Sequence, residues 1–249
     1  MAPEESKESK GRETKRYILD TALGLFREQG FDETTMRGIA AKAGLSIGAA
    51  YHYFPSKESF ILAYYERVHG EHEKRFQSAL TPDADLRARL GAAIHTKLDI
   101  MAEDRKMLGA LLRYLGNPNH PLSIFAPGLK GIRDQSIGVF ADVLDNQKMP
   151  EDLRAIAPVL LWILHLGLVL YLLHDNSPDQ KQTRRLVNGS VDLVAQFFGI
   201  AGFPLLKPIR RKVLAVLEEA RLTPPDVQLV TDSADQVTIS NSSRSEGVV

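Results

Sequence analysis

Tyrosine, histidine and lysine side chains are concentrated in residues 45–58, which read LSIGAAYHYFPSKE. Phenol and imidazole groups donate and accept hydrogen bonds, and a lysine ammonium attracts anions. The same stretch contains the small pair Gly48 and Ala49, which lets a helix backbone approach a ligand closely. On a helix, this combination suits the major groove of DNA, where the polar atoms can reach phosphates or base edges.

Two predicted helices precede this stretch and position it. Residues 14–29 carry apolar side chains at helical spacing, and Gly30 stands where a left-handed C-terminal cap is expected. Thr34 and Thr35 offer a cap for a second helix, and Gly44 ends it. The apolar positions are Ile18, Ala22, Leu25 and Phe26 in the first helix, and Met36, Ile39, Ala40 and Ala43 in the second. The glycine-containing turn that follows is typical of a helix-turn-helix.

The third predicted helix presents one face outward. Ser46 can cap it, and Pro55 ends it after Phe54. A helix this short does not persist alone in water, so packing on the first two helices must hold it. With Ala50 and Phe54 placed inward at 100° per residue, the outward positions are Gly48, Ala49 and His52, with Tyr51 and Tyr53 on the flanks.

Two cations lie near helix starts. Lys57 falls in the first turn of a fourth helix that Ser56 can cap, where the helix dipole disfavours a cation by roughly 0.3–1 kcal/mol. A phosphate bound there would reverse that sign. Arg37 beside Thr35 makes a second plausible phosphate site. Taken singly, the rings could form a hydrophobic plug and the lysine could be merely solvated, but the ordered caps and short helices favour nucleic acid.

The remaining sequence also predicts helices. These segments are about 84–115, 128–147, 150–174, 178–199 and 204–222. Ser177, Pro178 and Gln180 form a predicted capping box for the fourth of them. The last is amphipathic, with one side formed by Leu206, Ile209, Val213, Val216 and Leu217 and the other by Arg210, Arg211 and Lys212. We therefore expect an all-α protein.

Composition limits the possible chemistry. The chain of 249 residues contains no cysteine, which excludes disulfides, zinc thiolate sites and cysteine nucleophiles. Lysine plus arginine and aspartate plus glutamate number 31 each, so any DNA contact must depend on local charge. No apolar secretory signal is visible at the start, and we expect a cytoplasmic protein.

Residues 155–173 contain no charged side chain, which satisfies the length criterion for a membrane span. Pro158 and His165 lie inside this segment, however, and polar residues follow it directly. A helix that is apolar on all sides can equally be buried in a protein or against a partner chain. We expect a helix buried in the protein or against a partner chain, and no membrane.

Residues from Thr14 to about Tyr65 resemble the N-terminal DNA-binding domain of the tetracycline-repressor (TetR) family of bacterial transcriptional regulators. The resemblance is carried by TALGLFREQGFDETTMRGIAAKAGLSIGAAYHYFPSKESFILAYY. It implies a three-helix helix-turn-helix domain over residues 14–72, with the motif at about 35–54, and a ligand-binding and dimerisation helical bundle over 73–222. Residues 1–13 are predicted to be a disordered arm, and 223–249 a disordered tail.

The resemblance also implies which residues touch DNA and what the protein does. The positions matching DNA contacts in the family are Thr35, Arg37, Ser46, Gly48, Ala49, Tyr51, His52, Tyr53 and Lys57. Tyr51 and Lys57 would hold phosphates, whereas His52 and Tyr53 would help to read sequence. The expected function is that of a repressor that a small molecule of unknown identity releases from a double-stranded DNA operator, with no cofactor.

A homodimer is expected through the helices at about 150–174 and 178–199. The second of these presents an apolar stripe with small residues that permit close approach: Leu186, Leu193, Val194 and Phe197, with Gly189 and Ser190. The helix over 204–222 could either cover a pocket entrance or extend the dimer contact. Residues that could line a pocket, but are as easily core, are Met101, Met107, Tyr114, Phe125, Trp162 and His165.

Other functions are less consistent with these patterns. The run HGEHE, residues 69–73, resembles a metal cluster, but its spacing is not H-E-x-x-H, and we expect a charged, solvated helix face and no metal. No phosphate-binding loop or serine elbow is present, so an enzyme is not expected. A DNA-binding regulator controlled by a protein partner predicts a filled core, whereas a ligand-controlled repressor predicts a cavity of roughly 300–1,000 Å³.

Overall fold

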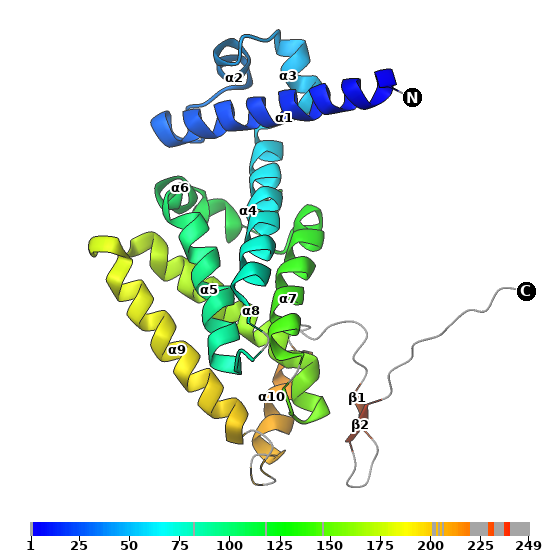
Figure 1. Cartoon of the computed structure of the whole chain (residues 1–249), viewed down its shortest axis with the longest axis vertical. Helices are drawn as coiled ribbons and strands as arrows, with labels where there is room; N and C mark the ends of the chain where they lie inside the picture. Colours follow the sequence, from blue (N-terminus) through cyan, green and yellow to red (C-terminus); the bar gives the residue numbers. More distant parts are fainter. Residues whose placement is uncertain are drawn as a thin grey trace, which may run out of the picture.

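Helices form almost all of the part of the chain that the computed structural model describes (Figure 1). That part consists of residues 2–81, 83–117, 119–145, 147–200, 203, 205, 207–219, 229–231 and 237–239. Its α-helices are α1 (Ala2–Gln29), α2 (Met36–Lys42), α3 (Ile47–Tyr53), α4 (Lys57–Ala79), α5 (Leu86–Ala102), α6 (Arg105–Leu115), α7 (Lys130–Leu144), α8 (Glu151–His174), α9 (Lys181–Ile200) and α10 (Lys207–Glu219). The predicted all-α fold is confirmed.

Local signals in the sequence determine the three-helix head formed by α1, α2 and α3. Thr35 Oγ1 accepts a hydrogen bond from the Gly38 amide at the start of α2. Ser46 Oγ does the same for the Ala49 amide at the start of α3. Gly44 ends α2 with a φ of 69°, a left-handed conformation that glycine adopts without steric cost. The predicted caps and turn are confirmed.

An aromatic cluster forms the core of the head. The rings of Phe54 and Phe60 stack with their centroids 4.0 Å apart, and Phe26 meets Phe60 edge-on at 6.3 Å. Phe31, directly after the glycine that ends α1, packs against Phe26 at 5.1 Å. These contacts join α1, the end of α3 and the start of α4, so α3 is held by packing and not by its own length.

Helix α4 connects the head to the rest of the molecule. It leaves the head beneath α1 and enters the larger bundle, where it packs against α5 and α7 (Figure 1). It continues without a break through residue 72, the predicted domain boundary. Its first turn therefore supports the end of α3 through Phe60, and its later turns belong to the bundle.

Helix α8 lies at the centre of the bundle and contacts α5, α6, α7, α9 and α10. Among the described residues it is the one helix whose length and composition would allow it to cross a membrane, and 44% of its most apolar window is buried within the protein. The buried helix of a soluble protein passes the same test. Its contacts on several sides agree with the expectation of a helix packed within the protein.

The N-terminal segment differs from its prediction. Residues 2–13, expected to be a disordered arm, continue α1 to Ala2. Lysine, arginine and glutamate have high helix propensity, and the Thr14 hydroxyl donates to the Lys10 carbonyl within the helix. The helix of residues 14–29 therefore extends toward the N-terminus.

Two predicted helices of the bundle have different boundaries. Residues 84–115 form two helices, because the chain turns at Glu103 and Asp104, where the Asp104 carboxylate binds Arg27. Residues 128–147 form α7 after a 3-10 turn, η1 (Pro127–Leu129).

The predicted capping box at Ser177 is wrong. Residues 178–180 form a 3-10 turn, η2 (Pro178–Gln180), in which Asp179 and Gln180 have positive φ, so α9 begins only at Lys181. Two side chains cap the start of α9 without that box. The Asp175 carboxylate accepts hydrogen bonds from the amide and the hydroxyl of Thr183 at 2.8 and 2.6 Å, and Ser177 Oγ accepts one from the Gln182 amide at 3.1 Å.

The C-terminal part also differs in detail. In α10, Leu214 is buried, whereas Ile209, Val213 and Val216 of the predicted apolar face are exposed. This rotation brings Arg210 Nε to 3.1 Å from an Asp152 carboxylate oxygen on α8. The other two predicted apolar positions fall where the structure describes no side chain.

Part of the predicted disordered tail is ordered. Two strands, β1 (Leu229–Thr231) and β2 (Val237–Ile239), pair antiparallel. Valine, isoleucine and threonine favour strands, which gives this segment a reason to pair. The rest of residues 223–249 lies outside the described residues.

Candidate nucleic-acid interface and internal cavity

Helix α3 presents the predicted outward face. Ala50 and Phe54 are buried at 0% and 2% exposure, whereas Gly48 and His52 are exposed and Tyr51 keeps 49% of its surface accessible. This orientation is confirmed. The remaining predicted contact residues divide by burial: Thr35, Arg37 and Ser46 are exposed, and Ala49, Tyr53 and Lys57 are half-buried. The polar groups of this face have room to bind a partner, and DNA contact by each residue stays a prediction.

Lys57 has a structural contact that its sequence position does not reveal. Its ammonium donates hydrogen bonds to the carbonyls of Phe31 at 2.7 Å and Asp32 at 3.0 Å, and it lies 4.5 Å from the centre of the Phe31 ring. The charge therefore ties the start of α4 to the turn between α1 and α2. Two of its three N–H donors are used in this way, and a phosphate contact by the third stays a prediction.

Basic residues of α1 lie near α3 and were not among the predicted contacts. Lys15 places its ammonium 5.6 Å from the centre of the Phe54 ring at the end of α3. Arg12 and Arg16 are exposed on the same helix. Their positive charge was the available signal. The predicted disordered arm ended at residue 13, and no DNA contact was predicted for the arm or for the helix that follows it.

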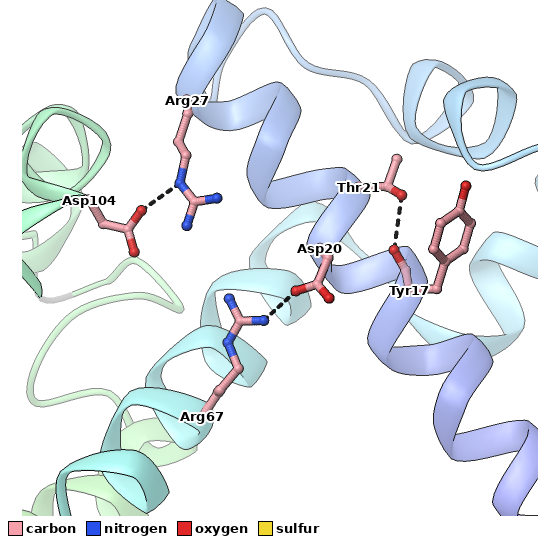
Figure 2. A network of polar contacts seen from close by, with 6 residues as sticks. All are labelled: Tyr17, Asp20, Thr21, Arg27, Arg67 and Asp104. Carbon is pink, nitrogen blue, oxygen red and sulfur yellow. Dashed lines mark hydrogen bonds and ion pairs between the residues drawn. The ribbon is translucent and has the colours of Figure 1, made fainter. Parts of the chain in front are cut away.

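Two ion pairs connect the head to the bundle (Figure 2). Arg27 of α1 donates from Nε to the Asp104 carboxylate at 2.5 Å, and Arg67 of α4 donates to Asp20 of α1. The Asp104 side chain is almost completely buried, whereas both members of the other pair are exposed. Tyr114 adds a third link, because its hydroxyl donates to Asp32.

The histidines of the HGEHE run are buried, so the expected solvated face is wrong for them. His69 and His72 are 7% and 4% exposed, respectively. The His72 ring nitrogen Nε2 lies 2.7 Å from the Ala93 carbonyl of α5. Glu73, in contrast, is exposed. The reason is that α4 turns one of its faces toward α5 along this part of the bundle.

A cavity of about 290 Å³, partly open to the surface, lies between α4, α5, α6, α7 and α8. Its walls are mainly leucine, isoleucine, valine and aromatic side chains. Of the six residues considered as possible pocket lining, Met101, Trp162 and His165 line it. Phe125 is instead exposed at the surface. The bundle therefore lacks the filled core that a regulator controlled by a protein partner predicts. No described residue of α10 lines the cavity.

Burial and one cation determine the charge state inside the cavity. Burial lowers the pKa of Lys97 to about 8. Burial first and then the charge of Lys97 lower the pKa of His72 to about 4 and that of His165 to about 3. At neutral pH both imidazoles are uncharged, and the ammonium of Lys97 is protonated.

Helices α8 and α9 expose an apolar surface that we call the α8/α9 face. On α8 it consists of Ile163, Leu170 and Tyr171. On α9 it consists of Leu186, Leu193, Phe197 and Ile200, of which Leu193 is 68% exposed. Monomeric soluble proteins rarely leave such a contiguous apolar surface uncovered, so this face is suited to contact another chain.

Comparison with known families accounts for both parts of the molecule. Residues 18–64 match the model of bacterial regulatory proteins of the tetR family. Residues 89–213 match the model of the tetracyclin repressor-like C-terminal domain. The two matches cover the head with the first part of α4, and most of the bundle.

Individual regulators are also similar. The HTH-type transcriptional repressor KstR2 of Rhodococcus jostii is 34% identical over 104 residues, which is 40% of this chain and 49% of that protein. The HTH-type transcriptional regulator AcrR of Shigella flexneri is 33% identical over 100 residues, 39% of this chain and 46% of that protein. The chain thus spans about half the length of these relatives.

Solved structures share the fold. A TetR transcriptional regulator from Nitrosomonas europaea superposes with a TM-score of 0.60 at 20% identity, covering 73% of this chain and 98% of that one. A tetR-family regulator from Streptomyces coelicolor gives 0.56 at 24% identity, covering 82% and 89%. The families and relatives are regulators and not enzymes. From its outward-facing third helix and the matches to both domains, the chain belongs to the TetR family of bacterial regulatory proteins.

Proposed function

We propose that this protein is a cytoplasmic repressor that binds operator DNA as a homodimer and is released when a small molecule occupies the cavity of the bundle. The observation that carries the proposal is the role of α4. Its first turn packs on the end of α3 through the Phe54–Phe60 stack, and the turns that follow contribute Tyr64, Val68 and His72 to the cavity. A ligand inside the bundle thereby acts on the helix that supports the DNA-reading surface.

In this proposal, α3 enters the major groove with its exposed face. Tyr51 and the third N–H donor of Lys57 bind phosphates, and His52 contacts a base edge. Arg12 and Arg16 add phosphate contacts from α1, because their helix lies beside α3. Gly48 and Ala49 carry no side-chain hydrogen-bonding groups, so sequence preference falls on His52, Tyr53, backbone amides and DNA shape.

The α8/α9 face is the proposed dimer contact. Its exposed leucine, isoleucine and phenylalanine side chains would be buried against the same face of a second copy, as an isologous two-fold interface requires. The two heads of the dimer then bind half-sites about 34–36 Å apart, which is one turn of DNA. A ligand that favours a different separation of the heads weakens DNA binding by its differential affinity for the two states.

The junction shown in Figure 2 would transmit this change. Asp104 directly precedes α6, whose Leu108 and Leu112 line the cavity, and the carboxylate binds Arg27 of the head. A shift of α6 on ligand binding would therefore move the head through an ion pair whose carboxylate is buried. The exposed Asp20–Arg67 pair is a weaker connection, because solvent screens it.

The experiment that tests the function is recovery of genomic DNA fragments bound by the purified protein, followed by affinity measurements on the derived operator. Nanomolar, salt-dependent binding of a two-fold symmetric site is the expected result. Binding to all fragments with one affinity would contradict the proposal.

Three variants test the assignments on α3 and Lys57. Tyr51→Phe and Lys57→Ala should weaken binding to operator and random DNA alike, and the lysine variant should lower the salt dependence by about one phosphate contact. His52→Ala should change the preferred sequence instead. If all three affect specific and random DNA equally, the proposed division between phosphate and base contacts is wrong.

The dimer contact is tested by sedimentation. Leu193→Glu places a charge at the centre of the α8/α9 face and should yield monomers that bind operator poorly. The matched control is Phe125→Glu, which changes an exposed apolar residue outside this face, 63% exposed, and should leave the dimer intact. A Leu193→Glu protein that remains dimeric would place the interface elsewhere.

A further inference from the structure

The cavity has an unusual balance of charge. Its walls include two cationic side chains, Lys97 of α5 and Arg133 of α7, and no aspartate or glutamate. Among the described residues, neither cation forms an ion pair: Arg133 donates to the Ile124 carbonyl at 3.0 Å, and no partner is found for Lys97. The cavity therefore presents uncompensated positive charge to whatever occupies it.

Lys97 is held where a cation is costly. The Lys97 side chain is half-buried in the cavity wall, and its ammonium lies close enough to His69, His72 and His165 to lower the pKa of all three. None of these neutral imidazoles can neutralise it. An unpaired ammonium in apolar surroundings is destabilising, and such groups in proteins are usually paired or hydrogen-bonded.

A second polar group in the wall also lacks a partner. His165 of α8 is 5% exposed, and its Nδ1 makes no hydrogen bond to any described residue. Because this nitrogen has almost no accessible surface, the wall groups that indicate a ligand polar at one end are the cations Lys97 and Arg133. The leucine and isoleucine side chains that form most of the wall suit an apolar remainder.

We propose that the cavity binds an amphipathic anion, with a carboxylate or phosphate head paired with Lys97 and an apolar body among the leucine and isoleucine side chains. This inference rests on the proposed function, since it names the chemical class of the effector. A cationic amphiphile of the same length would meet an unpaired ammonium and is excluded.

The test uses the full-length protein and four probes of equal chain length: octanoate, octyl phosphate, octanamide and octylammonium. Isothermal titration at pH 7 should give an affinity for at least one anion about tenfold or more above that for the amide, because the charged head gains a charge-assisted hydrogen bond. Octylammonium should not bind measurably. Preference between octanoate and octyl phosphate distinguishes the two possible heads.

Lys97→Met keeps the length of the side chain and removes its charge. The variant should lose the preference for the anion while retaining its affinity for octanamide, and its melting temperature without ligand should not fall. Lys181→Met, at an exposed position that begins α9, is the matched control and should bind like the unchanged protein. If Lys97→Met does not fold, the ranking of the four probes on the unchanged protein still decides the question.

Three results would overturn the inference: equal affinities for anion and amide, no binding of any probe at millimolar concentration, or an anion preference that survives in Lys97→Met. Operator release is measured separately. If an anion binds but does not release DNA, the anion site stands and the proposed switch fails. If octylammonium releases DNA, the switch stands and the anion site fails.

Discussion

The outward face of α3 and the cavity of the bundle use the same residue types in opposite environments. His52 and Tyr51 are exposed to solvent, whereas His72 and His165 are buried. Lys57 donates to two backbone carbonyls, whereas Lys97 faces an apolar wall without a partner. The polar groups of the face are exposed to water, so they cost the folded protein little. The cavity carries its desolvation cost in the folded state.

In the head, the residues that stabilise the fold are different from the residues proposed to bind a partner, whereas in the cavity wall they are not separate. Under α3, stability comes from apolar contacts, and the binding groups can be changed with little effect on folding. Around the cavity, the binding groups themselves weaken the fold, and a ligand would remove part of that cost. Variants of the two regions should therefore change stability and binding in different combinations.

The largest effect is expected below α3. Phe54→Ala removes a buried ring that stacks on Phe60, and should lower the free energy of unfolding by about 3–5 kcal/mol and abolish operator binding. Urea denaturation followed by circular dichroism measures the first, and fluorescence anisotropy with labelled DNA the second. Phe125→Ala, at an exposed position, should stay within about 0.5 kcal/mol of the unchanged protein. A Phe54→Ala protein that still binds operator would show that α3 does not need this anchor.

The next largest effect is expected on the free energy of unfolding when the pH is lowered, because the buried histidines of the cavity wall become protonated. The pKa of His72 is about 4 in the folded protein against an ordinary value of 6.5, because burial and then Lys97 disfavour the imidazolium. The unfolded chain thus binds more protons between these values, and stability should fall by about 3 kcal/mol as the pH drops from 6.5 to 4. His165 acts in the same direction.

Denaturation at several pH values measures this loss. His72→Gln keeps a donor for the Ala93 carbonyl but cannot be protonated, so its stability should depend less steeply on pH in this range. His174→Gln is the control, because His174 is exposed at the end of α8. An unchanged slope in His72→Gln would mean that water reaches this imidazole.

The junction between the two regions offers a matched pair of variants. Arg27→Met leaves the buried Asp104 carboxylate without its partner and should cost about 1–3 kcal/mol. Arg67→Met breaks the exposed pair with Asp20 and should cost at most about 1 kcal/mol. If Asp104 also transmits the ligand signal, only Arg27→Met should reduce the change in operator affinity that an effector causes. Equal coupling in both variants would assign transmission to another contact.

The head could be predicted from sequence because short-range signals determine it. Gly44 and Ser46 act within a few positions of themselves, and the i to i+4 spacing of Ala50 and Phe54 identifies the buried side of α3. Of the candidate site, the exposure of Tyr51 and His52 followed from the same spacing. These rules need no knowledge of distant partners.

Contacts between residues far apart in the chain could not be predicted in this way. Lys57 has the sequence signature of a surface lysine, yet it bonds to the carbonyls of Phe31 and Asp32. His72 lies in a charged run, and only the approach of α5 buries it. The unpaired state of Lys97 depends on which side chains the other helices bring near it. Helical spacing alone carries no information about such neighbours.

The smallest effect tests the outward face most directly. Gly48 lies in the first turn of α3, and a Cβ added there meets no atom within 4 Å, so Gly48→Ala should stabilise the protein by roughly 0.5 kcal/mol. If the backbone of α3 approaches DNA at this point, the added methyl group should nevertheless weaken operator binding. Gly24→Ala is the matched control, because that position in α1 is equally free of neighbours and lies outside α3. If Gly48→Ala alone gains stability and loses operator binding, one side of this seven-residue helix supports the fold and the other contacts DNA. If binding is unchanged in both variants, DNA does not contact this face.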